Sequence, residues 1–133
     1  MAKGKEKPYA GIWYIKVLDT NYDIYVDNDP KYLDSYNADG LTDDLLKTIH
    51  IRNIFKNKDL DNKKSAEIEF KRILRHELLH AFIYECGLSG NGLEKEAWPI
   101  SESMVDFIAI QFEKLSKLYN EAYNIVKEVK EKS

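Results

Sequence analysis

The hydrophobic pattern in the first half of the chain is that of β-strands. Residues 12–26 are rich in tyrosine, isoleucine and valine, and the run is interrupted once, at residues 19–21, where Asp-Thr-Asn suits a turn. This pattern predicts two antiparallel strands joined as a hairpin. Apolar side chains fall on both faces of the first strand, so we expect one face of the sheet to meet helices.

A third strand is predicted farther along, at residues 48–52. Polar and apolar side chains alternate there, which turns Ile49 and Ile51 inward and leaves Thr48 and His50 outward. We expect this strand to lie at an edge of the sheet. The segment between the second and third strands contains Asp-Asn-Asp-Pro and Asn-Ala-Asp-Gly, which are turn-forming sequences. It predicts an irregular connection with room for one short strand.

The second half of the chain carries helical periodicity. Residues 63–86 contain no proline or glycine and place apolar residues at helical spacing. Asp61 or Asn62 can cap the start of this helix, and Gly87 can end it. A second helical pattern begins around Pro99. The residues that share one side of it are Met104, Phe107, Ile108, Gln111, Leu115 and Leu118.

Together these elements predict one α+β domain over residues 1–133. An antiparallel sheet of about three strands packs on the helix of residues 63–86 and on a second, C-terminal helix. Residues 1–8 are expected to be flexible, and residues 120–133 to form a charged helical tail. The composition, 44% hydrophobic and 32% charged, is ordinary for a folded globular protein and too apolar for a disordered one.

Charge and cysteine content narrow the partners and the compartment. A net charge of −3 creates no strong field that would point to nucleic acid or an anionic membrane. The segment from Arg52 to Arg75 contains eight basic and four acidic residues. Because it carries no recognisable nucleic-acid-binding module, a solvated helix face explains these charges better than a nucleic-acid interface. No apolar run approaches the roughly 20 residues that span a bilayer, and no export signal is visible. The single cysteine, Cys86, cannot form an internal disulfide, which favours a reducing cytoplasm.

The candidate chemistry lies in the first predicted helix, in the sequence His76-Glu77-Leu78-Leu79-His80. Residues four apart on an α-helix differ by about 40° around its axis, so the two histidines project from one face as a pair of ligands for one ion. Neutral imidazole suits zinc. Glu77 points to the adjacent edge of that face, where it can reach a metal-bound water without binding the metal. It is the candidate general base.

A catalytic zinc ion also needs a third protein ligand and an open position. The second helix supplies Glu102 and Asp106, whose spacing of four places both carboxylates on one helical face within an apolar segment. Glu102 could complete the set of ligands while Asp106 accepts the remaining ring N–H of His76 and fixes its tautomer. Glu94 and Glu96 are alternative third ligands, but they fall in a predicted loop and lack a paired acid.

These residues resemble the gluzincin metallopeptidases, which carry His-Glu-x-x-His on one helix and Glu-x-x-x-Asp on the next. By this resemblance His76, His80 and Glu102 bind zinc, Glu77 is the general base and Asp106 orients a histidine ligand. The small size, the strands ahead of the motif and the run His-Glu-Leu-Leu-His-Ala-Phe are similar to the compact gluzincins of bacteria, phages and mobile elements, including the ImmA/IrrE-like group.

The resemblance implies a zincin-like fold and zinc-dependent hydrolysis of a peptide bond in a protein or peptide substrate. In zincins the substrate lies extended along an edge strand, so we expect it to follow residues 48–53, with His50 and Thr48 as contacts. Larger gluzincins use a further domain to supply a carbonyl-polarising residue, for which this chain leaves no room. The hydroxyl of Tyr84, Tyr119 or Tyr123 could stabilise the oxyanion, but the chain has nine tyrosines, and packing in the core or on the surface explains each of these three better.

Two other functions remain open at this point. A non-enzymatic zincin-like module would use the metal to organise a small core or a regulatory interface, and Glu77 would then be dispensable. A DNA-associated phage protein would use the basic segment and bind DNA in a salt-dependent way, without zinc. The peptidase is favoured because the motif contains a base as well as ligands.

Overall fold

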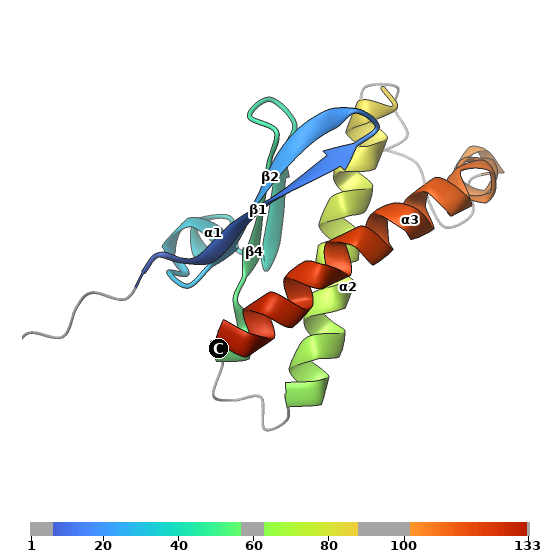
Figure 1. The fold of residues 1–133 in the computed structure, drawn as a ribbon. Coiled ribbons are helices and arrows are strands. Elements are labelled where there is room, and N and C mark those ends of the chain that lie inside the picture. Colours follow the sequence, from blue (N-terminus) through green and yellow to red (C-terminus); the bar gives the residue numbers. More distant parts are fainter. Residues whose placement is uncertain (1–6, 57–62, 88–101, 133) are drawn as a thin grey trace, which may run out of the picture.

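The chain folds into a four-stranded mixed sheet that carries two long helices on one face (Figure 1). The computed structural model describes residues 7–56, 63–87 and 102–132, and the side chains of these residues except 63, 102–106 and 109. The predicted α+β class is confirmed. The elements of the described residues are β1 (Tyr9–Val17), β2 (Thr20–Asp27), α1 (Lys31–Ser35), β3 (Gly40–Asp43), β4 (Thr48–Arg52), the short 3-10 helix η1 (Ile54–Lys56), α2 (Lys63–Glu85) and α3 (Glu102–Lys132).

The strands are arranged in the order β1-β2-β4-β3. β1 and β2 form the predicted antiparallel hairpin, β2 and β4 run parallel, and β3 pairs antiparallel with β4. Two predictions about the sheet were therefore wrong. The described sheet has four strands of mixed direction instead of about three antiparallel ones, and residues 48–52 form an interior strand instead of an edge. The edges of the described sheet are β1 and β3.

The additional strand, β3, lacks both the composition that predicted β1 and β2 and the alternation that predicted β4. Its sequence Gly-Leu-Thr-Asp contains no fully buried position. A parallel pair such as β2 and β4 requires a crossover connection, and α1 and β3 lie within this one. The segment predicted as an irregular connection thus contains a short helix and an edge strand.

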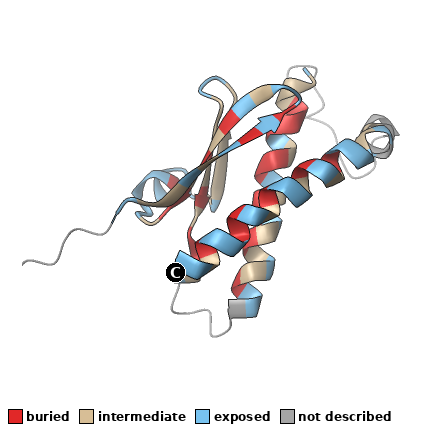
Figure 2. Cartoon of the chain, in the orientation of Figure 1, coloured by how far each residue is buried: buried red, intermediate tan, exposed pale blue. Residues whose placement is uncertain are grey.

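Alternate residues of the strands form the core together with the inner faces of α2 and α3. Ile24 and Ile49 are fully buried on the sheet, and Phe70, Leu74 and Leu78 are fully buried on α2 at helical spacing. Figure 2 shows buried positions gathered where the two helices meet the sheet. The burial of this face fixes the rotation of α2 about its axis, and therefore the direction in which its outer residues point.

The end of α2 follows the prediction. Gly87 adopts a left-handed backbone with φ of 75°, and its amide bonds to the carbonyl of Tyr84 at 3.0 Å. A glycine accepts this conformation without the steric penalty of a Cβ, which is why it stops the helix here. The predicted caps at the start of the helix, Asp61 and Asn62, lie outside the described residues.

The last part of α3, predicted as a charged helical tail, packs against the rest of the fold. The helix continues to Lys132, and Ala122, Val126 and Val129 are buried in the common core. The Trp13 indole on β1 donates a hydrogen bond to Glu128. The tail is therefore solvated on one side only. Among the described residues, no helix combines the length and apolarity that crossing a bilayer requires.

Candidate metal centre

The two histidines of the predicted motif lie one turn apart on the exposed side of α2. The Nε2 atoms of His76 and His80 are 3.1 Å apart, and their ring centroids are 4.8 Å apart. Two nitrogen ligands of a tetrahedral zinc ion, each about 2.0–2.1 Å from the metal, would be separated by roughly 3.3 Å. The separation of the two nitrogens is therefore close to that of two ligands of one metal ion, and it is also within hydrogen-bond distance.

The predicted third ligand, Glu102, is the first residue of α3, and Asp106 lies one turn later. Both positions are helical, as predicted, while their side chains lie outside the described part of the structure. The alternatives Glu94 and Glu96 lie outside it altogether. Within the described residues, no cluster of three or more histidine, cysteine, aspartate or glutamate side chains is arranged to hold a metal ion. The structure thus brings two of the predicted ligands together, and the third stays a prediction.

Glu77 points from α2 toward the sheet. The residue is only 6% exposed, and the Thr42 hydroxyl on β3 lies 2.8 Å from its Oε1 and 3.0 Å from its backbone oxygen. Gly40 packs against the same side chain, where a Cβ would come within 2.9 Å of Oε2. A buried carboxylate requires such a donor, because its transfer out of water is otherwise highly unfavourable. The candidate base is thus held between its own helix and an edge strand.

A cavity of about 230 Å³ opens between α2 and the chain that leads into β3. Two of its charged side chains have ion-pair partners, since Asp39 pairs with Arg52 and Arg72 pairs with Glu69. The cavity combines one candidate metal ligand with the candidate base, so a substrate group entering it would meet both. Its lining residues are Ala38, Asp39, Gly40, Arg72, Ile73, His76 and Glu77.

A free edge of the described sheet borders this cavity. β3 pairs on one side, with β4, and its other side faces no described strand, so backbone groups there can pair with another extended chain. The substrate was predicted to follow residues 48–53 as an edge strand. The edge position was wrong, because β4 pairs with β2 on one side and with β3 on the other. The edge strand beside Glu77 is β3.

The predicted substrate contacts, His50 and Thr48, lie on the face of the sheet opposite α2, since the alternate residues of β4 face the core. His50 Nδ1 is 2.9 and 3.0 Å from the two carboxylate oxygens of Asp27. The His50 ring stacks on Tyr25 with 4.6 Å between centroids, and Tyr32 of α1 packs at 4.5 Å. The structure does not bring His50 or Thr48 to the histidine pair.

The three tyrosines considered for oxyanion stabilisation have different surroundings. The ring of Tyr84 stacks beside His80, with 6.3 Å between centroids. The hydroxyl of Tyr123 accepts a hydrogen bond from Arg75 at 3.0 Å. Tyr119 packs against the core, and burial raises the pKa of its hydroxyl. Of the three, Tyr84 is the one placed next to a predicted metal ligand.

A second glutamate, Glu85, joins the C-terminal end of α2 to the sheet. Its Oε1 accepts a hydrogen bond from Thr20 at 2.6 Å, and its Oε2 accepts bonds from Tyr22 and Lys47, both at 2.7 Å. Burial disfavours the charged form of Glu85, but the bonds from Lys47, Thr20 and Tyr22 outweigh it and lower the pKa of the carboxyl to about 2. Glu85 is therefore a fixed negative charge.

Sequence reasoning missed Gly40 and Thr42. Thr42 lies 35 residues before Glu77, and the two are brought together only by the packing of β3 on α2. No local spacing signals such a contact, because a glycine near a threonine in a turn-rich segment is common. The contact could be found only from the fold.

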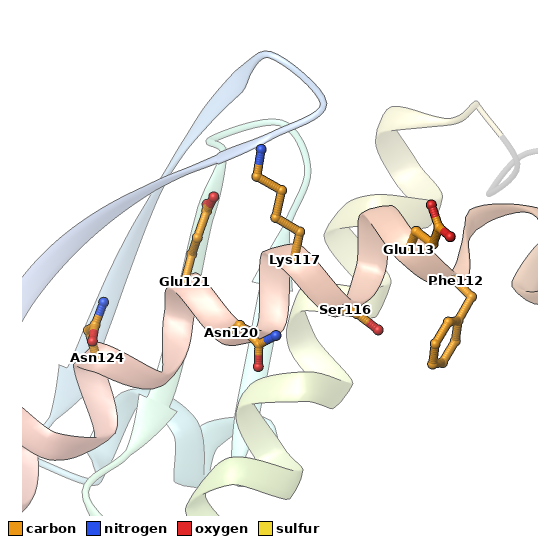
Figure 3. Close-up of a pocket in the computed structure, with 7 residues that line it drawn as sticks. All are labelled: Phe112, Glu113, Ser116, Lys117, Asn120, Glu121 and Asn124. Carbon is orange, nitrogen blue, oxygen red and sulfur yellow. The ribbon is translucent and has the colours of Figure 1, made fainter.

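A hollow larger than the cavity beside Glu77 lies along α3 (Figure 3) and has a volume of about 590 Å³. It is lined by side chains of one helix, which carry both signs of charge, and none of the predicted site residues is among them. We therefore assign it no role in the chemistry. Its lining residues are Phe112, Glu113, Ser116, Lys117, Asn120, Glu121 and Asn124.

Comparison with known proteins gives no relative, since no family model, curated protein or solved structure matches the chain. A function must therefore be inferred from the residues described above.

Proposed function

We propose that the protein is a zinc-dependent metallopeptidase of the gluzincin type, which hydrolyses peptide bonds in a protein or peptide substrate. One arrangement carries the proposal: the Nε2 atoms of His76 and His80 lie 3.1 Å apart, and the buried Glu77 lines a cavity beside the free edge of β3. Helical spacing by itself accounts for the closeness of the two histidines. It does not explain why the intervening glutamate is buried, hydrogen-bonded and next to a cavity.

His76 and His80 would hold the zinc ion, with Glu102 as the third protein ligand. If Nε2 of His76 binds the metal, its Nδ1 would donate a hydrogen bond, which Asp106 would accept. When bound, zinc supplies Lewis acidity, which activates water and polarises a carbonyl near neutral pH.

Glu77 would act as the general base. Its carboxylate takes a proton from the attacking water as the new C–O bond forms, and delivers that proton to the leaving nitrogen as the C–N bond breaks. Glu77 and His76 line the same cavity, which supports this role because the base must reach the atoms held near the metal ligands.

The substrate would lie as an extended strand against the free edge of β3. Main-chain hydrogen bonds to β3 would provide affinity without demanding a particular sequence. One substrate side chain would enter the cavity of about 230 Å³. This arrangement replaces the strand of residues 48–53 by β3 and keeps the predicted mode of binding.

Glu77→Gln tests the proposal. We expect the zinc-loaded wild-type protein to cleave members of a peptide library, read by mass spectrometry. The variant should keep about one zinc ion per chain and lose roughly 10²- to 10⁴-fold in kcat/KM, because the amide cannot accept the proton.

Glu67→Gln is the matched control. It makes the same change on the same helix, at a carboxylate that pairs with Lys130 and Lys71. Its activity should equal that of the wild type. Undiminished cleavage by Glu77→Gln would refute the role of the base, and a zinc-loaded wild type that cleaves nothing would favour a non-enzymatic metal-binding module.

A further inference from the structure

Strand β3 presents two of its four residues to Glu77. Gly40 and Thr42 are alternate residues of this strand, so they share one face of the sheet, and both contact Glu77. Their partners on β4 are Ile51 and Ile49, which are fully buried. The surface that receives Glu77 is therefore anchored to the core of the protein.

The Thr42 hydroxyl lies within hydrogen-bond distance of two oxygens of Glu77. It is 2.8 Å from Oε1 of the carboxylate and 3.0 Å from the backbone oxygen of the same residue. A hydroxyl has one hydrogen to donate, and the charged carboxylate is the stronger acceptor. Because threonine is branched at Cβ, its first side-chain torsion is stiff, and the direction of this bond is well defined.

Gly40 provides the space for the Glu77 side chain. A Cβ at this position would lie 2.8 Å from Cγ, 2.9 Å from Oε2 and 3.1 Å from Cδ of Glu77. The backbone does not demand glycine here, since Gly87 is the glycine with positive φ among the described residues. A side chain at position 40 would therefore have to displace the side chain of Glu77.

We infer that Gly40 and Thr42 are positioning residues for the general base. Thr42 anchors Oε1 of Glu77, and Gly40 leaves the space in which Oε2 lies beside the cavity. This inference rests on the proposed function insofar as Glu77 is taken to be the base, while the contacts themselves do not depend on it.

The two oxygens of Glu77 then have different tasks. Oε1 is engaged by the Thr42 hydroxyl, so Oε2 is the oxygen that carries the proton between water and the leaving nitrogen. Orientation matters at this step, because a displacement of about 1 Å at a reacting group can lower a rate on the order of 10²-fold. A strand that binds substrate at one side thus also orients the base.

The first arm of the test measures the kinetics of zinc-loaded variants of the full chain. Thr42→Val removes the hydroxyl at nearly constant shape. Gly40→Ala adds a methyl group that would come within 3.1 Å of three atoms of the Glu77 side chain. Both should lower kcat roughly 10- to 100-fold with KM changed less than about twofold, whereas Thr42→Ser should recover most of kcat. Thr20→Val is the matched control, because the Thr20 hydroxyl also donates to a glutamate of α2, Glu85. It should lower the melting temperature and leave kcat unchanged.

The second arm does not depend on activity. In crystal structures of the zinc-free proteins, the Glu77 carboxylate of Thr42→Val and of Gly40→Ala should be displaced by about 1 Å from its wild-type position. A carboxylate unmoved in both variants, or a kcat equal to that of the wild type in both, overturns the inference. If the wild type cleaves no peptide, the proposed function fails, and these crystal structures still decide whether β3 positions Glu77.

Discussion

Two glutamates of α2 meet the sheet in different surroundings. At the C-terminal end of the helix, Glu85 receives three donors, Thr20, Tyr22 and Lys47, all within 2.7 Å. These bonds outweigh burial and keep the pKa of the carboxyl at about 2. Such a group cannot take up a proton near neutral pH, so its role is to hold the helix on the strands.

Farther toward the N-terminus of α2, Glu77 has a single side-chain donor among the described residues, the hydroxyl of Thr42. Its second oxygen lies over Gly40, and both residues line the cavity. The difference shows how one helix can use the same residue type in two ways. Full satisfaction by hydrogen bonds and a cation makes a structural carboxylate, whereas an oxygen left uncommitted makes a candidate base.

The largest effect is expected on zinc affinity, when the two histidines of α2 are replaced. Replacing both His76 and His80 by alanine should weaken zinc binding on the order of 10³-fold or more, because two ligands of one ion are lost. The free energy of unfolding of the metal-free double variant should be within about 0.5 kcal/mol of that of the metal-free wild type, since both histidines are exposed. Calorimetric titration with zinc and urea denaturation measure the two quantities. Unchanged zinc affinity would place the metal elsewhere.

Substitution of Glu85, at the C-terminal end of α2, should lower stability and leave zinc binding unchanged. Glu85→Gln should lower the free energy of unfolding by about 2 kcal/mol, because bonds to a charged acceptor are weakened and Lys47 loses its partner. Zinc affinity and kcat should stay as in the wild type. Urea denaturation and peptide cleavage on the same sample decide the matter. A Glu85→Gln variant with normal stability and reduced kcat would contradict the assignment of a structural role to Glu85 and a catalytic role to Glu77.

The pH dependence of stability sharpens the same assignment. The folded pKa of Glu85, about 2, is below its ordinary value of 4.5, so the unfolded chain binds the proton more tightly. The stabilisation is fully present above pH 4.5 and is lost as the pH falls toward 2. The stability difference between wild type and Glu85→Gln should therefore shrink between pH 5 and pH 2. A difference that stays constant across this range would show that the charge of Glu85 is not what stabilises α2.

The smallest effect is expected at the exposed contact between α2 and α3. Glu67 pairs with Lys130 at 2.9 Å, and both side chains are substantially solvated. Glu67→Gln should change the free energy of unfolding by less than about 0.5 kcal/mol, as is usual for surface ion pairs. Urea denaturation at low and high salt measures it. A decrease of more than about 1 kcal/mol in the free energy of unfolding would mean that the pair of Glu67 and Lys130 contributes to the packing of α3 on α2.

The parts of the fold with a clear period could be predicted from the sequence. The hairpin of β1 and β2 follows from a run rich in tyrosine, isoleucine and valine that one turn interrupts, and α2 follows from helical spacing that ends at Gly87. The meeting of His76 and His80 is also a local property, because residues four apart on a helix are neighbours. Glu102 and Asp106 rest on the same reasoning and stay predictions.

The rest depended on contacts between distant segments. β4 was predicted at the edge because Thr48 and His50 are polar and point outward. Yet a polar outward face looks the same in sequence whether the strand is interior or not, and His50 is in fact packed against Tyr32 of α1. β3 had no period at all, so the contacts of Gly40 and Thr42 with Glu77 had no sequence signature.

The central claim is that the histidine pair on α2 is half of a catalytic zinc site. The most direct measurement is a crystal structure of the zinc-loaded protein with anomalous scattering at the zinc edge. We predict one ion, bonded at about 2.0–2.1 Å to Nε2 of His76 and of His80, with Glu102 as third protein ligand and an open position facing Glu77. An ion bound elsewhere, or two imidazoles that share no ion, would contradict the claim.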